Sequence, residues 1–266
     1  MHPIERLRYV ARASGAAQRS LVRETAAALA AFTSDHQALV TACRRVVSRQ
    51  PWAGSLVWYC ARVLSAGDPD DEVWDAAGLI QADATASVAA RELPDDATVV
   101  VLGWPEVLAE ALARRGDLRV LVVDVLDEGA SLADQLQARD IDAVDVPVWG
   151  LGRAVAAADL LVIEAIAAGP DAVLAPAGSL AAAAVARTVD VPVWVAAPLG
   201  RTLPAPMFDE VVARTIGVGE PDCELERVPV ALLDDGLSAD GRAEIAQILA
   251  RPECPTVPEL FRGDVI

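Results

Sequence analysis

The sequence contains neither lysine nor asparagine, and it has only two histidines. All 22 basic residues are therefore arginines. Without lysine, the chain cannot form a Schiff base or place a P-loop lysine on a nucleotide phosphate. Without asparagine, Cys–His–Asn catalysis is excluded. The four cysteines lack the CxxC spacing of zinc sites, so we expect reduced, mostly buried thiols and no bound metal.

Positive charge is also scarce, because 22 basic residues face 39 acidic ones and the formal net charge is −17. This balance argues against direct binding to nucleic acid or to anionic membranes, which both need a cationic face. Two origins stay open: adaptation to a salt-rich, halophilic cytoplasm, and codon drift in a GC-rich genome. The longest uncharged stretch, residues 172–186, is too short to span a membrane. We therefore expect a cytoplasmic protein.

The first third of the chain has helical periodicity and no strand-like alternation. Proline, glycine, serine and aspartate separate its segments, which predict four helices. They are expected at residues 16–32, 35–48, 54–64 and 72–90. The turn at Leu93 and Pro94 marks a change of character. We therefore predict a helical domain over residues 1–93 and a second domain over residues 94–266.

In the second domain, short β-branched runs alternate with helical segments. Strands are predicted at residues 98–102, 119–124, 142–146, 159–164 and 191–197. Helices are predicted at residues 105–114, 131–139, 180–187 and 238–251, with another beginning near Gly152. This alternation predicts an α/β fold with a Rossmann-like, mainly parallel sheet covered by helices on both faces. The C-terminal segment is expected to wrap this sheet or to form an oligomer contact.

Ligands bind such sheets at the carboxyl ends of the strands. Asp124, Glu164 and Asp171 lie near strand ends and are the candidates for acid–base catalysis, if the protein is an enzyme. Gly178 and Ser179 open a helix, whose free amides favour an anion, although the local sequence favours Ser179 as a plain helix cap. Two tryptophans follow predicted strands and are expected to plug a pocket there: Trp104 and Trp149. Gly150 and Gly152 lack the third glycine of a dinucleotide fingerprint, so no cofactor is expected.

Several stretches resemble one known family in order and spacing. They are residues 50–56, which are similar to Arg-Pro-Thr-x-x-x-Leu, the strands and loops at 99–104 and 121–133, the segment 158–179, and the strand 191–197. Together they resemble the translation initiation factor 2B alpha/beta/delta family. That family also contains the ribose-1,5-bisphosphate and methylthioribose-1-phosphate isomerases. The resemblance implies a homodimer that forms through the sheet domain.

The chain departs from the family at the positions that carry chemistry. The isomerases' cysteine and aspartate fall near Gly103 and on Ile166, and a family arginine falls near Leu126. The family's Asn-Lys pair falls on Ala175 and Pro176. A further arginine falls on Gln50, with Arg49 adjacent as a substitute. The proton-transfer pair of an isomerase and most of its phosphate-binding charge are therefore missing.

These departures predict a divergent, non-catalytic regulatory or metabolite-binding protein. A small anionic metabolite is expected at Gly178, Ser179, Arg201 and Arg49. Two alternatives stay open: a sugar-phosphate isomerase with a rebuilt site, and a structural subunit of a larger complex. A translation factor is a further candidate partner.

Overall fold

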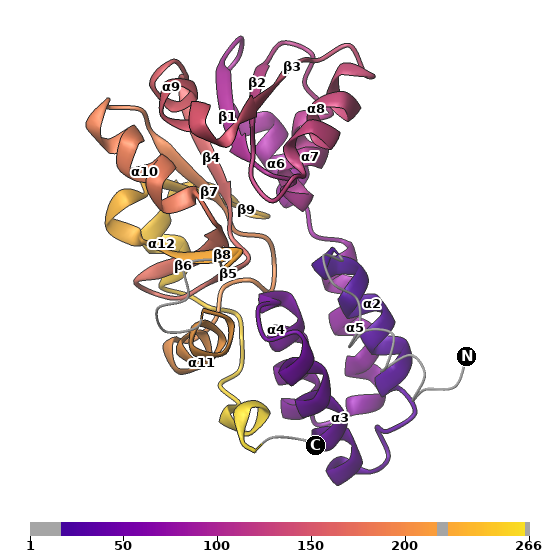
Figure 1. The fold of residues 1–266 in the computed structure, drawn as a ribbon. Helices are drawn as coiled ribbons and strands as arrows, with labels where there is room; N and C mark the ends of the chain where they lie inside the picture. The colour runs from indigo at the N-terminus through magenta and orange to yellow at the C-terminus, as the bar shows by residue number, and fades with distance from the viewer. Residues whose placement is uncertain (1–16, 217–222, 264–266) are drawn as a thin grey trace.

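The computed structural model describes residues 17–216 and 223–263, in which a helical part precedes an α/β part (Figure 1). The helices of the first part pack against one another around one apolar core. They are α2 (Gln18–Leu29), α3 (His36–Arg49), α4 (Gly54–Ser65) and α5 (Pro69–Gln81). α4 lies at the centre, because it is apolar nearly all round and buries both Trp58 and Tyr59.

Local caps define where two of these helices begin. The carboxylate of Asp35 accepts hydrogen bonds from the amides of Gln37 and Ala38 at the start of α3. Asp68 accepts in the same way from the amide of Asp70 at the start of α5, where Pro69 takes the first helical position. Both arrangements are favoured because the first amides of a helix have no partner within the helix.

The single helix predicted at residues 72–90 is wrong. The structure has α5 up to Gln81 and a separate α6 (Thr85–Glu92) after a short break. The two helices pack in different cores: α5 contacts α2 and α4, whereas α6 contacts the sheet and the next helix. The chain breaks because one straight helix cannot bury its apolar face against both.

The main sheet has the strand order β10-β9-β7-β4-β1-β2-β3, and every neighbouring pair is parallel except the β9–β10 hairpin. Its strands are β1 (Thr98–Leu102), β2 (Arg119–Asp124), β3 (Asp142–Pro147), β4 (Leu160–Glu164), β7 (Val193–Ala196), β9 (Asp235–Ser238) and β10 (Gly241–Glu244). The expected α/β class with a mainly parallel sheet is confirmed.

Helices cover both faces of this sheet. Successive strand residues point to opposite sides, so Val99 and Val101 of β1 enter one core and Val100 enters the other. The first core is closed by α6, α7 (Glu106–Leu112) and α8 (Gly129–Gln137). The second is closed by α9 (Leu151–Ala156), α10 (Ser179–Thr188) and α12 (Ile245–Leu249).

A small antiparallel sheet joins the two parts. It has the order β5-β6-β8 and consists of β5 (Ala167–Ala168), β6 (Ala172–Pro176) and β8 (Leu225–Pro229). Leu174 of β6, Phe208 of α11 (Ala205–Thr215) and Phe261 near the C-terminus all enter the core of the helical bundle. Segments between the strands of the main sheet and the segment after them therefore return to the N-terminal helices (Figure 1).

The helix predicted at residues 238–251 is also wrong in its first half. The structure forms the β9–β10 hairpin there, and only the short α12 follows it. Gly241 has a φ of +128°, and Ser238 Oγ accepts from the amide of Asp240, which stabilises the tight turn. β9 pairs with β7, so extended structure here satisfies backbone groups that a helix would leave open at the sheet.

No helix in the described part of the chain is long and apolar enough to cross a membrane.

Candidate functional site

A cavity of about 810 Å³ lies at the carboxyl ends of β1, β2 and β4, between the main sheet and the helical bundle. The loops after β1 and β2 form one wall, through Gly103–Glu106 and Val125–Glu128. Ser179 at the start of α10 lies on another side, and the bundle contributes Gln18 and residues 49, 50 and 52. This is the edge at which parallel α/β sheets bind their ligands.

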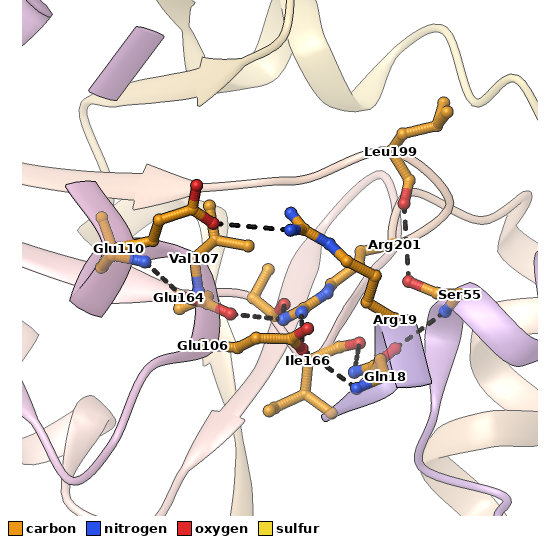
Figure 2. A network of polar contacts seen from close by, with 12 residues as sticks. Gln18, Arg19, Ser55, Glu106, Val107, Glu110, Glu164, Ile166, Leu199 and Arg201 are labelled. Atoms are coloured by element: carbon orange, nitrogen blue, oxygen red, sulfur yellow. Dashed lines mark hydrogen bonds and ion pairs between the residues drawn. The ribbon is translucent and has the colours of Figure 1, made fainter. Parts of the chain in front are cut away.

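A buried ion pair lies in the wall of this cavity (Figure 2). Arg201 is 3% exposed and Glu164 is 5% exposed. Nη1 of Arg201 donates to Glu164 Oε1 at 2.8 Å and to the carbonyl of Ala165 at 2.7 Å. Its Nη2 donates to Glu106 Oε2 at 3.0 Å. The guanidinium is therefore shared by two carboxylates, and its charge is already compensated.

The same network fastens the helical bundle to the sheet (Figure 2). The amide of Gln18 donates to Glu106 Oε2 at 3.0 Å, and its Nε2 donates to the carbonyl of Ile166 at 2.9 Å. The side-chain oxygen of Gln18 accepts from the amide of Ser55 at 2.9 Å. One buried glutamine therefore contacts α4, α7 and the segment after β4.

The chain's own carboxylates occupy the helix starts around this edge. Glu164 Oε2 accepts from the amides of Val107 and Leu108 in α7, at 2.8 and 3.0 Å. Asp124 Oδ1 accepts from the amide of Gly129 in α8 at 2.8 Å. Glu226 of β8 accepts from the amide of Leu180 in α10. A helix N-terminus attracts anions, and here each attraction is met from within the chain.

Burial raises the pKa of Glu164 above its usual value, and the neighbouring charge of Glu106 acts in the same direction. Arg201 and the two amide donors of α7 oppose this shift and favour the ionised form. Two polar atoms of cavity-lining residues remain buried and have no hydrogen-bond partner within the described residues: Ser179 Oγ and Arg201 Nε.

The residues predicted to bind a ligand lie close together. Arg49, Ser179 and Arg201 line the cavity. Gly178 lies directly behind it with a φ of +95°, and a Cβ there would meet Leu102 at 3.3 Å. Arg201 is paired with Glu164 and Glu106. Glu226 accepts from the amide of Leu180, directly after Gly178 and Ser179. Anion binding at these residues stays a prediction.

The three predicted catalytic carboxylates do not converge. Glu164 lines the cavity, whereas Asp124 and Asp171 are absent from its described walls. Asp171 forms an exposed ion pair with Arg227, between side chains that are 65% and 44% exposed. The positions of Gly103 and Ile166, where the isomerases carry their catalytic pair, do line the cavity. Neither residue can transfer a proton through its side chain.

Only one of the two tryptophans expected to plug the pocket is near it. Trp104 lines the cavity, whereas Trp149 is 87% exposed and lies away from the cavity walls. Trp149 follows β3, which is the edge strand of the sheet and contributes no residue to the described cavity walls. Trp52 of the bundle contributes the second indole instead.

Three important residues escaped the sequence analysis: Gln18, Glu106 and Glu226. Glu106 carried a weak signal, because an acidic residue directly after Pro105 is typical of a first helical turn. Gln18 and Glu226 carried none, since their partners lie 37 and 46 residues away in the chain. Among the described residues, no three His, Cys, Asp or Glu side chains are arranged to hold a metal.

Fold and cavity together define a class: a helical bundle joined to a Rossmann-like sheet, with a pocket between them at the carboxyl ends of the strands. No protein-family model matches the sequence, and no curated protein matches it. Solved structures do match its fold. Initiation factor eIF-2B from Pyrococcus horikoshii OT3 superposes with a TM-score of 0.76 at 15% identity, over 93% of this chain and 98% of that one.

Two further structures agree. The tetrameric eIF2B-beta2-delta2 complex from C. thermophilum gives a TM-score of 0.76 at 16% identity, over 93% of this chain and 92% of that one. The eIF-2B delta subunit from A. fulgidus gives 0.61 at 15% identity, over 98% and 92%. The chain thus has the fold of the eIF2B subunits, and the resemblance to the initiation factor 2B alpha/beta/delta family is confirmed at the level of the fold.

Proposed function

We propose that this chain is a non-catalytic, small-molecule-binding protein with a regulatory role, built on the eIF2B fold. One observation carries the proposal: two of the groups that could hold a phosphate at this edge are paired with carboxylates of the chain itself. Arg201 contacts Glu164 and Glu106, and the first turn of α10 contacts Glu226. Sugar-phosphate isomerisation needs both an anion site and a proton-transfer pair, and among the described residues neither Gly103 nor Ile166, the positions that the resemblance assigns to that pair, carries a proton-transfer group.

The cavity nonetheless retains the attributes of a binding site. Its volume of about 810 Å³ falls in the range of roughly 300–1,000 Å³ typical of small-molecule pockets. Its apolar walls, two indoles and a few buried polar atoms also match the usual composition of such sites. This combination favours binding over a purely structural role.

A turnover assay tests the proposal against the isomerase alternative. The purified chain is incubated with ribose 1,5-bisphosphate and with methylthioribose 1-phosphate, and the ketose product is measured. We expect no product above the background. Turnover that is lost in Glu164→Gln or Asp171→Asn, but kept in the matched surface variant Asp240→Asn, would overturn the proposal and establish a rebuilt isomerase.

Assembly is a second part of the proposal. Val148 and Trp149 are 51% and 87% exposed beside the edge strand β3, which suits burial against a second protein surface. We propose a homodimer through the sheet domain, with a translation factor as a further candidate partner. Light scattering is expected to give the mass of a dimer for the native chain and that of a monomer for Trp149→Ser. A monomeric native chain would contradict this part.

The division into domains at residues 93 and 94 and the salt-rich cytoplasm remain predictions.

A further inference from the structure

Three carboxylates at the cavity have no compensating charge within the described residues. Asp127, Glu128 and Glu224 line it and are exposed, and within the described residues their side chains take part in no ion pair or hydrogen bond. Glu106 and Glu164 are paired with Arg201, which leaves Arg49 as the other cation of the described walls. Five carboxylates thus face two guanidinium groups, and the field of the cavity favours a positive ligand.

The loop that carries two of these carboxylates is held in an unusual conformation. Leu126 and Asp127 both have a left-handed backbone, with φ values of +62° and +58°. Residues other than glycine rarely adopt this region of backbone conformation. Each such residue lowers the stability of the fold by on the order of 1 kcal/mol or more. Asp127 and Glu128 of this loop both line the cavity.

Aromatic and buried polar groups add independent support. Trp104 and Trp52 line the same cavity, and an indole face attracts an organic cation. The hydroxyl of Ser179 is fully buried and unpartnered in the described structure, as is Nε of the cavity-lining Arg201. Buried polar atoms are almost always hydrogen-bonded. We therefore expect a ligand hydroxyl group or a water molecule to form hydrogen bonds with these two atoms.

We propose that the cavity binds a hydroxylated organic amine, of the amino-sugar or amino-alcohol class, and excludes the corresponding phosphate. This inference rests on the proposed binding function and specifies its ligand. The ammonium group faces Asp127, Glu128 and Glu224, and the hydroxyl groups reach Ser179 and Arg201. The chain's own carboxylates repel a phosphate from the positions where its fold would otherwise accept one.

A matched set of sugars tests the charge preference. Glucosamine, glucose and glucose 6-phosphate share one ring and differ in charge, and each is titrated at low salt while the melting temperature is followed. A ligand that binds the native state must raise that temperature. We expect a shift with glucosamine, little with glucose and none with the phosphate. The glucosamine shift is expected to fall as salt is raised, since exposed charges are screened.

Two double variants locate the effect. Asp127→Asn with Glu128→Gln removes two charges at the cavity while keeping a residue that tolerates a left-handed backbone. This variant is expected to bind glucosamine about tenfold more weakly. Asp190→Asn with Asp240→Asn removes two exposed charges that do not line the described cavity, and it is expected to bind like the native chain.

The outcomes separate this inference from the proposed function. A shift with glucose 6-phosphate but not with glucosamine would overturn the cationic ligand and leave a binding protein. An equal loss of the glucosamine shift in both double variants would also overturn it, because the effect would then follow net charge alone. No shift in melting temperature with any of the three sugars would overturn the proposed class of ligand, the hydroxylated amines. Turnover in the isomerase assay would instead overturn the proposed non-catalytic function.

Discussion

The helix starts of the bundle and those at the cavity are capped in two different ways. In the bundle, Asp35 and Asp68 cap the helices that begin directly after them. At the cavity, Glu164 caps α7 from 57 and 56 residues away, and Glu226 contacts α10 from 46 residues away. A local cap defines one helix, whereas a distant cap also fixes a strand against that helix.

This difference has a consequence for function. The caps in the bundle are exposed and do not line the cavity between the sheet and the bundle, so we expect them to affect stability rather than ligand binding at that cavity. The distant caps lie at helix starts around the cavity edge, and under the proposed function they also decide what the site accepts. Carboxylates have the same local role in both regions, but we propose that they exclude a class of ligand in only one.

The largest effect is expected for Glu164→Ala. The substitution leaves Arg201 buried with one carboxylate and exposes the amides of α7 to an empty space. Breaking a buried ion pair typically lowers the free energy of unfolding by about 3–5 kcal/mol. Urea denaturation monitored by tryptophan fluorescence measures this loss.

Asp171→Ala is the control, because its ion pair with Arg227 is exposed and at most about 1 kcal/mol is expected. Similar losses in the two variants would mean that the buried network contributes no more to the free energy of unfolding than an exposed ion pair does.

The pH dependence of stability gives the next effect. Because the folded protein raises the pKa of Glu164 above 4.5, its carboxyl binds a proton more tightly in the folded than in the unfolded state. The group therefore stabilises the fold below its unfolded pKa, and this contribution is lost as the pH rises through the folded pKa. Within that window the loss is about 1.4 kcal/mol per pH unit.

Urea titrations of the native chain and of Glu164→Gln, compared at several pH values from 4 to 8, isolate this contribution. The native chain is expected to lose stability relative to the variant as the pH rises above the ordinary value for glutamate. A difference that grows in favour of the native chain with rising pH would show that Arg201 and the amides of α7 lower the pKa instead.

Parts of the fold were accessible to sequence reasoning because their signals are local. The strands at residues 98–102 and 119–124 were predicted to the residue, since each is a β-branched run bounded by turns and charge. The hairpin of β9 and β10 was missed, because Ser238 also resembles a helix cap and because pairing with β7 decides the outcome. The break between α5 and α6 likewise depends on which core each helix enters.

The residues of the candidate site also differ in whether local sequence signals could identify them. Glu164 and Ser179 could be named, because one ends a strand and the other opens a helix in a parallel sheet. Arg201 was named only through the family resemblance. Their partners could not, since Glu106 and Glu226 reach them only after the helices and the small sheet have packed. The sequence could therefore not show which carboxylates pair with Arg201 and with the start of α10, although most of the predicted residues line the cavity.

The smallest effects are expected where single caps are removed, and they test the comparison directly. Asp35→Ala and Glu226→Ala should each lower the free energy of unfolding by about 1 kcal/mol. Hydrogen exchange should separate them: the first variant exposes amides in α3 alone, whereas the second exposes amides in both α10 and β8, because Glu226 lies on β8 opposite Ala175. Faster exchange confined to the capped helix in both variants would mean that the distant carboxylate acts as a local cap does. Its proposed role in holding β8 against α10 would then be refuted.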